Sequence, residues 1–241
     1  MTTVPRLSIV IPARNEEFEL GATLDSVREA AEAVGQPWEC IVVNDGSTDR
    51  TAEIAREKGI RVVDVELHNI GAVRNAGAAV TLGERLVFLD ADTRIPPETL
   101  RAAWQAMDDG AVGGGGWVRF DQLKGSLKIP VALFAWFWLR VCRWAAGCFI
   151  FCTKEAFESV GGFDETYFAS EERFISQALK RVGRFMILRE HVVTSSRKAR
   201  LYSVRQLLTL AFRALLGGRK MLMQREGLEI FYDAPRESSE S

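Results

Sequence analysis

Residues 7–12 read LSIVIP, an apolar and β-branched run that ends at a proline. The pattern returns at residues 39–44 (ECIVVN) and 85–90 (RLVFLD). Runs in which apolar residues follow one another without polar alternation are typical of strands buried on both faces of a parallel sheet. These three segments therefore predict the centre of a buried sheet.

Helical spacing fills the gaps between these strands. Apolar residues recur every three or four positions at residues 20–34, 49–58 and 71–80, and a further short strand is expected at 60–65. Strands that alternate with helices form parallel sheets with right-handed crossovers. The sequence therefore predicts an α/β protein with a Rossmann-like, mixed but mainly parallel sheet and helices on both faces.

The second half of the chain is less regular. A glycine run at residues 113–116 indicates either a hinge or close backbone packing, and it lacks the spacing of a dinucleotide-binding loop. The elements expected in this half are helices at 97–107, 154–160 and 170–182 and strands at 117–121, 148–153 and 185–188.

Composition limits the class of protein. The chain has 241 residues, 47% of them hydrophobic, and its 31 basic and 32 acidic residues leave a net charge of −1. This is the composition of a folded domain, without the basic excess of a protein that binds nucleic acid polymers. Four unevenly spaced cysteines indicate neither a disulfide framework nor a zinc site. The N-terminus lacks a signal-peptide pattern, and Arg140 and Arg143 interrupt the most apolar stretch, so we expect a cytoplasmic protein without a membrane-spanning helix.

Acidic residues stand at the ends of two predicted strands. Asp45 follows the strand at 39–44, and Asp90 and Asp92 follow the apolar run at 86–89. Ligands gather at the carboxyl ends of parallel strands, and two carboxylates one residue apart can share a hard divalent cation. Each aspartate alone is equally typical of a turn. Together they predict a site for a metal ion and a phosphate at this edge of the sheet.

Five ordered stretches of the chain resemble the family-2 glycosyltransferases, which have the GT-A fold and use nucleotide-diphosphate sugars. They are SIVIPARNE (8–16), IVVNDGSTD (41–49), GAVRNAG (71–77), FLDAD (88–92) and GGFDE (161–165). The resemblance covers about residues 7–190. The ordered set is highly specific, although each piece alone is not.

The resemblance implies a donor site at the ends of the first strands. Asp45 would accept a hydrogen bond from the base, usually uracil, and Arg74 would reach the nucleotide unless it is a solvated charge on a helix face. Asp92 would be the direct ligand of Mn²⁺ or Mg²⁺, with Asp90 on the sugar side. The donor-binding set that the resemblance implies is Pro12, Ala13, Asn15, Glu16, Asp45, Arg74 and Asp90.

The second half would supply the catalytic base. Glu171 and Glu172 stand where the family has Glu-Asp at a helix start, which implies Glu172 as the base and Glu171 as the second choice. Acidic residues in a first turn are also ordinary, because the helix dipole favours negative charge there. His191 is implied as a metal or phosphate ligand, and a buried, hydrogen-bonded histidine is the alternative.

Two segments favour a membrane surface. Residues 134–144 (FAWFWLRVCRW) set three tryptophans beside two arginines, a combination that is hard to bury. Residues 197–225 carry eight basic residues and no acidic one, which is typical of segments that bind anionic membranes, although a solvated helix face is an alternative. We expect a GT-A domain at 1–196, a basic helical appendage at 197–234 and a disordered tail at 235–241, in peripheral contact with a membrane.

These features predict an inverting glycosyltransferase that moves a sugar from a nucleotide-diphosphate donor, a UDP-sugar, to the hydroxyl of an unidentified acceptor. A polymerising synthase is disfavoured, because the Gln-x-x-Arg-Trp motif is absent. Two alternatives stay open. A non-catalytic nucleotide-sugar-binding protein is conceivable because Glu-Glu replaces Glu-Asp, and a sugar-phosphate nucleotidyltransferase has a similar sheet, although residues 12–16 lack its glycine-rich loop.

Overall fold

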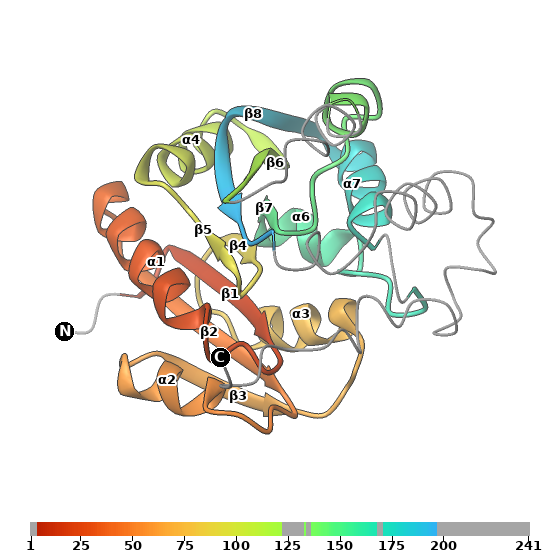
Figure 1. Cartoon of the computed structure of the whole chain (residues 1–241). Helices are drawn as coiled ribbons and strands as arrows, with labels where there is room; N and C mark the ends of the chain where they lie inside the picture. Colours follow the sequence, from red (N-terminus) through yellow and green to blue (C-terminus); the bar gives the residue numbers. More distant parts are fainter. Residues whose placement is uncertain (1–3, 122–132, 134–135, 168–170, 197–241) are drawn as a thin grey trace.

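The computed structural model describes residues 4–121, 133, 136–167 and 171–196. These residues form an eight-stranded sheet in the order β3-β2-β1-β4-β7-β6-β8-β5 (Figure 1). The strands are β1 (Leu7–Ala13), β2 (Trp38–Asp45), β3 (Arg61–Val65), β4 (Arg85–Leu89), β5 (Thr93–Arg94), β6 (Ala111–Phe120), β7 (Phe149–Thr153) and β8 (Arg184–Thr194).

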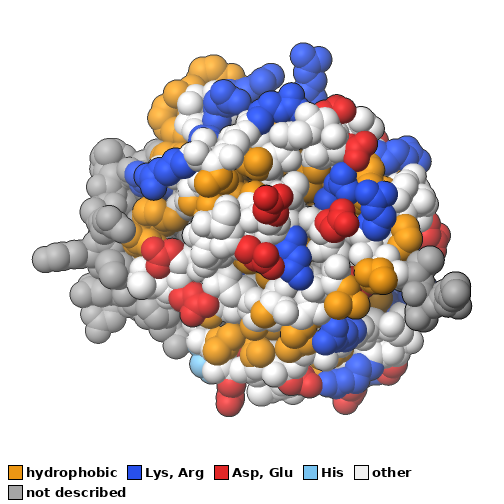
Figure 2. Space-filling view, turned by 180° about the vertical axis from the view of Figure 1, so that it is seen from behind, with side chains coloured by type: hydrophobic (Ala, Val, Ile, Leu, Met, Phe, Trp, Pro, Cys, Tyr) orange, Lys and Arg blue, Asp and Glu red, His pale blue; other side chains and the backbone are white. Residues whose placement is uncertain are grey.

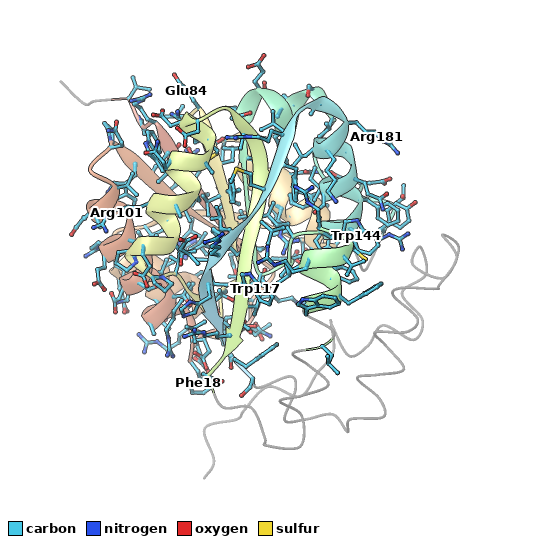
Figure 3. All side chains as sticks on the ribbon, turned by 90° about the horizontal axis from the view of Figure 1, so that it is seen from above. Phe18, Glu84, Arg101, Trp117, Trp144 and Arg181 are labelled. Carbon is cyan, nitrogen blue, oxygen red and sulfur yellow. The ribbon has the colours of Figure 1, made fainter. Side chains whose placement is uncertain are left out.

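The first four long strands run parallel, with β1 between β2 and β4. Every residue of β1 is buried, as its unbroken apolar run predicts. β7 runs antiparallel to both β4 and β6, so the sheet is mixed. The carboxyl ends of the parallel strands meet at one edge: in Figure 3 Phe18, just after β1, lies toward one end of the molecule, and Glu84, just before β4, lies at the other.

Helices cover both faces of this sheet (Figure 1). One core lies between the sheet and α1, α2 and α4, and the other lies between the sheet and α3, α6 and α7. The sequence period explains α1, whose buried residues include Leu20, Leu24 and Val27 and which ends at Gly35 in the left-handed conformation, φ 73°. The helices are α1 (Leu20–Val34), α2 (Thr51–Glu57), α3 (Ile70–Ala79), α4 (Pro97–Asp108), α6 (Lys154–Ser159) and α7 (Glu171–Val182), with a π-helical turn η1 (Phe137–Val141).

The glycine run at 113–116 lies inside β6 and is not a hinge. β6 pairs with β7 on one side and with β8 on the other. A Cβ atom at Gly115 would lie 2.7 Å from the Cβ of Ala145, and one at Gly113 would lie 2.8 Å from the carbonyl oxygen of Phe151. No side chain fits at these distances, so close packing, the second of the two expectations, explains the run.

β8 is longer than the sequence predicts. The expected strand covered 185–188, whereas β8 runs from Arg184 to Thr194 and pairs with β6 along most of this length. Its second half, REHVVT, carries charged residues that hide the strand pattern. His191 therefore lies within a strand and not after one.

Some predictions fall outside the described residues. These are the appendage at 197–234, the tail at 235–241 and Ser170 as the first residue of its helix. Among the residues that the structure describes, no helix is long and apolar enough to cross a membrane.

Candidate active site

Two loops at the carboxyl edge of the sheet interlock. The Asn15 side-chain oxygen accepts from the backbone N–H of Thr48 at 2.7 Å, and the Asn15 backbone N–H donates to Ser47 Oγ at 3.0 Å. Asn15 has φ 51°, a left-handed conformation that asparagine tolerates better than most residues. The loop after β1 is thus held against the loop after β2. The role of Asn15 in this structure is therefore to position the backbone of these two loops.

The other donor-site residues of β1 are also part of the framework. Pro12 and Ala13 are buried and pair with Val43 and Asn44 of β2. Glu16 is buried, and its backbone N–H donates to Thr51 Oγ1 at 2.7 Å, which fastens the start of α2. The structure therefore brings these residues together at the strand ends, as the motif predicts.

Asp45 ends β2 and fastens a neighbouring loop. Its side chain accepts from the backbone N–H of Leu67 at 2.7 Å and from that of His68 at 3.1 Å, in the loop that follows β3. The His68 ring nitrogen Nδ1 lies 3.7 Å from the carboxylate, and His68 has φ 52°. Left-handed residues outside glycine cluster at functional sites, where surrounding contacts hold them. Asp45 therefore positions the β3–α3 loop. It also lies where the resemblance predicts a contact with the nucleotide base.

Arg74 lies at the centre of the site. Its side chain is 2% exposed, although it belongs to the middle of α3. Nη1 donates to Glu171 Oε1 at 2.6 Å, and Nη2 donates to Asp90 Oδ1 at 2.9 Å and to the carbonyl oxygen of Gly147 at 2.8 Å. One guanidinium thus joins α3, the end of β4, the turn before β7 and the start of α7. The alternative of a solvated helix-face charge is wrong.

This cation stays charged. Burial alone would lower the pKa of Arg74, but the negative charges of Asp90 and Glu171 outweigh that effect and raise the pKa above its ordinary value. A buried ion pair is stable only where both charges have partners of good geometry. Arg74 meets this condition through two carboxylates and a carbonyl, and it neutralises charge on the donor side of the site.

Glu171 and Glu172 differ sharply in their surroundings. Glu171 is buried and bound to Arg74, whereas Glu172 is only partly buried. Burial raises the pKa of Glu172 and the neighbouring Glu171 raises it further, to about 8, although a backbone hydrogen bond and Arg74 oppose the shift. A carboxyl group with a pKa near the working pH is suited to proton transfer.

Glu172 faces the same turn as Arg74. A Cβ atom built at Gly147 would lie 3.7 Å from Glu172 Oε2 and 3.8 Å from Arg74 Nη2. Gly147 therefore lies close to both the predicted catalytic base, Glu172, and Arg74, which binds Asp90. Sequence reasoning missed Gly147, because a single glycine beside Cys148 carries no motif.

Asp90 and Asp92 have the chemistry of a site for a hard cation. Asp92 is partly exposed, and its Oδ1 lies 3.4 Å from the hydroxyl of Thr93 and 3.5 Å from that of Thr194. Within the described ranges, no three His, Cys, Asp or Glu side chains converge on one point. Mg²⁺ is commonly held by one or two carboxylates together with substrate phosphates, so this donor set fits such an ion without further protein ligands.

His191 lies elsewhere along β8. Its register partner is Trp117 of β6, and its carbonyl oxygen accepts from the Thr99 hydroxyl at 2.7 Å. Burial and the charge of Arg119 lower its pKa, while Glu98 opposes them. His191 is thus surrounded by α4 and the adjacent strand β6. Asp92, which lies just before β5, approaches β8 near Thr194 instead.

Asn75 holds the GGFDE stretch against α3. Its Nδ2 donates to the carbonyl oxygen of Phe163 at 2.9 Å and to Glu165 Oε1 at 2.8 Å, and its Oδ1 accepts from the Phe163 N–H at 2.9 Å. Phe163 lies under Arg74, with the guanidinium carbon 5.3 Å from the ring centre. The GGFDE stretch therefore packs against the Arg74 guanidinium through Phe163.

The aromatic segment is divided between the core and the surface. Trp138 is 6% exposed and donates to the Ala145 carbonyl oxygen at 3.0 Å, and its ring meets that of Trp144 edge to face. Trp136 is 54% exposed and Val141 is 54% exposed, on the same turn as the exposed Arg140. We use the name aromatic surface for the exposed residues of this segment together with the nearby exposed Leu133: Leu133, Trp136, Phe137, Arg140, Val141 and Arg143.

The parallel strand ends, their acidic residues and the mixed sheet define a transferase domain of GT-A fold. The chain belongs to glycosyl transferase family 2, which matches residues 8–160.

Sequence relatives match less than half of the chain. A 4,4'-diaponeurosporenoate glycosyltransferase of Staphylococcus haemolyticus is 41% identical over 103 residues, 40% of this chain and 26% of that protein. An undecaprenyl-phosphate 4-deoxy-4-formamido-L-arabinose transferase of Edwardsiella ictaluri is 38% identical over 115 residues, 45% of this chain and 35% of that protein. The matched part is thus about a quarter to a third of the length of these relatives.

Solved structures share the fold over most of the chain. S. aureus TarS 1-349 in complex with UDP-GlcNAc has a TM-score of 0.65 at 18% identity and covers 96% of this chain and 74% of its own. The mannosyltransferase PcManGT from Pyrobaculum calidifontis, in complex with GDP-Man and Mn²⁺, has a TM-score of 0.65 at 21% identity and covers 90% of this chain and 66% of its own. At these identities the likeness establishes the fold.

Proposed function

We propose that the protein is an inverting glycosyltransferase that moves a sugar from a nucleotide-diphosphate donor, a UDP-sugar, to a hydroxyl of a lipid-linked acceptor. The observation that carries this proposal is the pairing of Glu172, partly buried and with a raised pKa, with a donor-side carboxylate, Asp90, through Arg74 and Gly147. A single displacement requires a base and a donor that are held close together in a fixed orientation, and these contacts tie the two predicted positions to one turn.

In this mechanism Glu172 takes the proton from the acceptor hydroxyl. The acceptor oxygen then bonds to the anomeric carbon, while the bond from that carbon to the nucleotide diphosphate breaks and the leaving oxygen keeps the electron pair. Attack opposite the leaving group inverts the anomeric centre. Arg74 keeps Asp90 and α7 in register, so that base and donor are oriented before reaction.

Asp92, with Asp90 beside it, would hold Mn²⁺ or Mg²⁺. Such an ion, when bound, neutralises charge on the diphosphate. A carboxylate pair at a strand end and the Mn²⁺ in the PcManGT complex support this assignment. His191 stays a predicted additional ligand, although its described neighbours are Arg119, Glu98 and Thr99.

The aromatic surface supports an acceptor at a membrane. Trp136, Phe137 and Val141 are exposed beside Arg140, and aromatic residues next to cations suit the boundary between anionic headgroups and acyl chains. Figure 2 shows hydrophobic and basic side chains side by side at the upper left of the molecule. Two sequence relatives are named for compounds with long apolar chains, undecaprenyl phosphate and diaponeurosporenoate, which supports a lipid-linked acceptor.

Donor turnover tests this function. The protein would be mixed with UDP- and GDP-sugars, Mn²⁺ or Mg²⁺, and anionic vesicles that contain a long-chain alkyl glycoside, which offers free hydroxyl groups, and release of the nucleoside diphosphate would be followed. Glu172→Gln should reduce release about a hundredfold or more, as expected for loss of a general base. Glu155→Gln, in the exposed first turn of α6, is the matched control. Donor binding without turnover would favour the non-catalytic alternative, and release of diphosphate from a nucleoside triphosphate would favour a nucleotidyltransferase.

A further inference from the structure

Arg14 carries buried nitrogen atoms that no described residue uses. Its Nε and Nη1 are both buried and without a hydrogen-bond partner among the described residues, whereas Arg74 and Arg85 each have only Nε in this condition. A buried donor on a charged group is costly to leave unpaired. The guanidinium of Arg14 is therefore the part of this loop that gains most from an anion.

The place of Arg14 in the fold narrows the choice of anion. Arg14 directly follows β1, which lies between β2 and β4 in the sheet. Asp45, at the end of β2, is the predicted contact for the nucleotide base. Asp90, just after β4, lies on the predicted sugar side. A nucleotide-diphosphate donor that spans the two must pass the end of β1, with its phosphates between the base and the sugar.

The charges at this edge need a cation. The described carboxylates there include Asp45, Asp90 and Asp92, and a diphosphate adds further negative charge. Arg74 is already bound to Asp90 and Glu171. Arg14 has donors to spare, so it can offset the repulsion between the donor and the site.

The loop also holds Arg14 in place before any ligand arrives. Its neighbour Asn15 is fastened to Ser47 and Thr48, and the Glu16 N–H is fastened to Thr51. A residue flanked by fixed backbone loses little freedom on binding, which improves affinity.

We propose that Arg14 binds a phosphate of the nucleotide-diphosphate donor and so determines preference for the nucleotide over the nucleoside. This inference rests on the proposed function for the donor class. It assigns Arg14 a role in donor binding separate from that of Arg74, which acts on Asp90 and Glu171.

Calorimetric binding of UDP and uridine, and of GDP and guanosine, tests this role without requiring turnover. Arg14→Gln should weaken binding of the diphosphate about tenfold or more, as expected for a charge-assisted hydrogen bond, and should change binding of the matching nucleoside less than about twofold. Arg14→Lys should fall between Arg14→Gln and wild type. Arg50→Gln, on the neighbouring loop but exposed and paired with Glu53 and Glu57, is the matched control and should bind like wild type.

Thermal unfolding would confirm that each variant is folded. Unchanged diphosphate affinity in Arg14→Gln would overturn the inference and leave the proposed function intact. Equal weakening of nucleoside and diphosphate would overturn it too, because Arg14 would then order the loop and not contact phosphate. A wild-type protein that binds none of the four compounds would refute the donor class itself, and the role of Arg14 with it.

Discussion

Arg74 and Glu171, 97 residues apart in the chain, form an ion pair with an N–O distance of 2.6 Å inside the protein. This pair decides between the two glutamates at the start of α7. Glu171 is bound to a buried cation and is suited to structure, whereas Glu172 has a carboxyl group beside Gly147 with a raised pKa. We therefore propose Glu172 as the base.

Removal of Arg74 should destabilise the protein. Arg74→Met leaves Glu171 and Asp90 without their cation, and breaking a buried pair in this way costs about 3–5 kcal/mol. Chemical denaturation would measure the free energy of unfolding. The control is Arg56→Ala, which removes an exposed pair with Asp64 and should cost no more than about 0.5 kcal/mol. Equal costs for the two variants would show that the buried cluster contributes no special stability.

Glu172→Gln should stabilise the protein at alkaline pH. The folded-state pKa of Glu172, about 8, lies above its ordinary value, so the folded protein binds this proton more tightly than the unfolded chain. The stabilisation from that proton is present at low pH and is lost as pH rises toward 8. Relative to wild type, the melting temperature of Glu172→Gln should therefore increase from pH 5 to pH 9, by on the order of 2–4 °C for each kcal/mol. A difference that stays constant with pH would place the pKa of Glu172 at an ordinary value.

Ionisation of Glu172 should also control activity, which should increase with pH where the stability of the wild-type protein decreases. A base must be ionised to accept a proton, so kcat/KM should rise tenfold per pH unit below about 8 and level off above it. Initial rates from pH 5.5 to 9.5 at saturating metal would show the profile. A flat profile between pH 6 and 9 would argue against Glu172 as the base.

The aromatic surface should bind vesicles. Replacing Trp136 and Phe137 together by serine removes exposed side chains, so membrane affinity should fall several-fold while the melting temperature stays nearly unchanged. Flotation with anionic vesicles at low salt measures this binding. Leu82→Ser, at a still more exposed apolar position just before β4, is the control. Vesicle binding that survives the double replacement would move the contact to another part of the chain.

Gly162→Ala should loosen the GGFDE stretch. Gly162 has φ 75°, and an added Cβ would lie 2.7 Å from Asn75 Oδ1, the oxygen that accepts from Phe163. Gly161→Ala is the matched control, because φ is 80° there and no atom lies within 4 Å. Both substitutions carry the backbone strain of about 1 kcal/mol, and only Gly162→Ala should lose more through the clash. Equal losses of stability would mean that the Asn75 contact yields without cost.

Local patterns in the chain are enough to predict the centre of the sheet and the edge at which ligands are expected. Unbroken apolar runs predict β1, β2 and β4 because burial on both faces leaves no place for polar residues, and Asp45 and Asp90 follow these runs directly. Local periodicity likewise predicts α1 to the residue. These features depend only on neighbours in the chain.

The partners of the charged residues, in contrast, come from distant parts of the chain. Arg74 is a polar residue on a helix, and nothing near it in sequence predicts Glu171, Asp90 and Gly147 as its partners. The length of β8 and the packing of the glycine run in β6 depend equally on strands from distant parts of the chain. A buried charge takes its partner from whatever the fold brings within about 3 Å, and that distance is set by the packing of whole elements and not by local pattern.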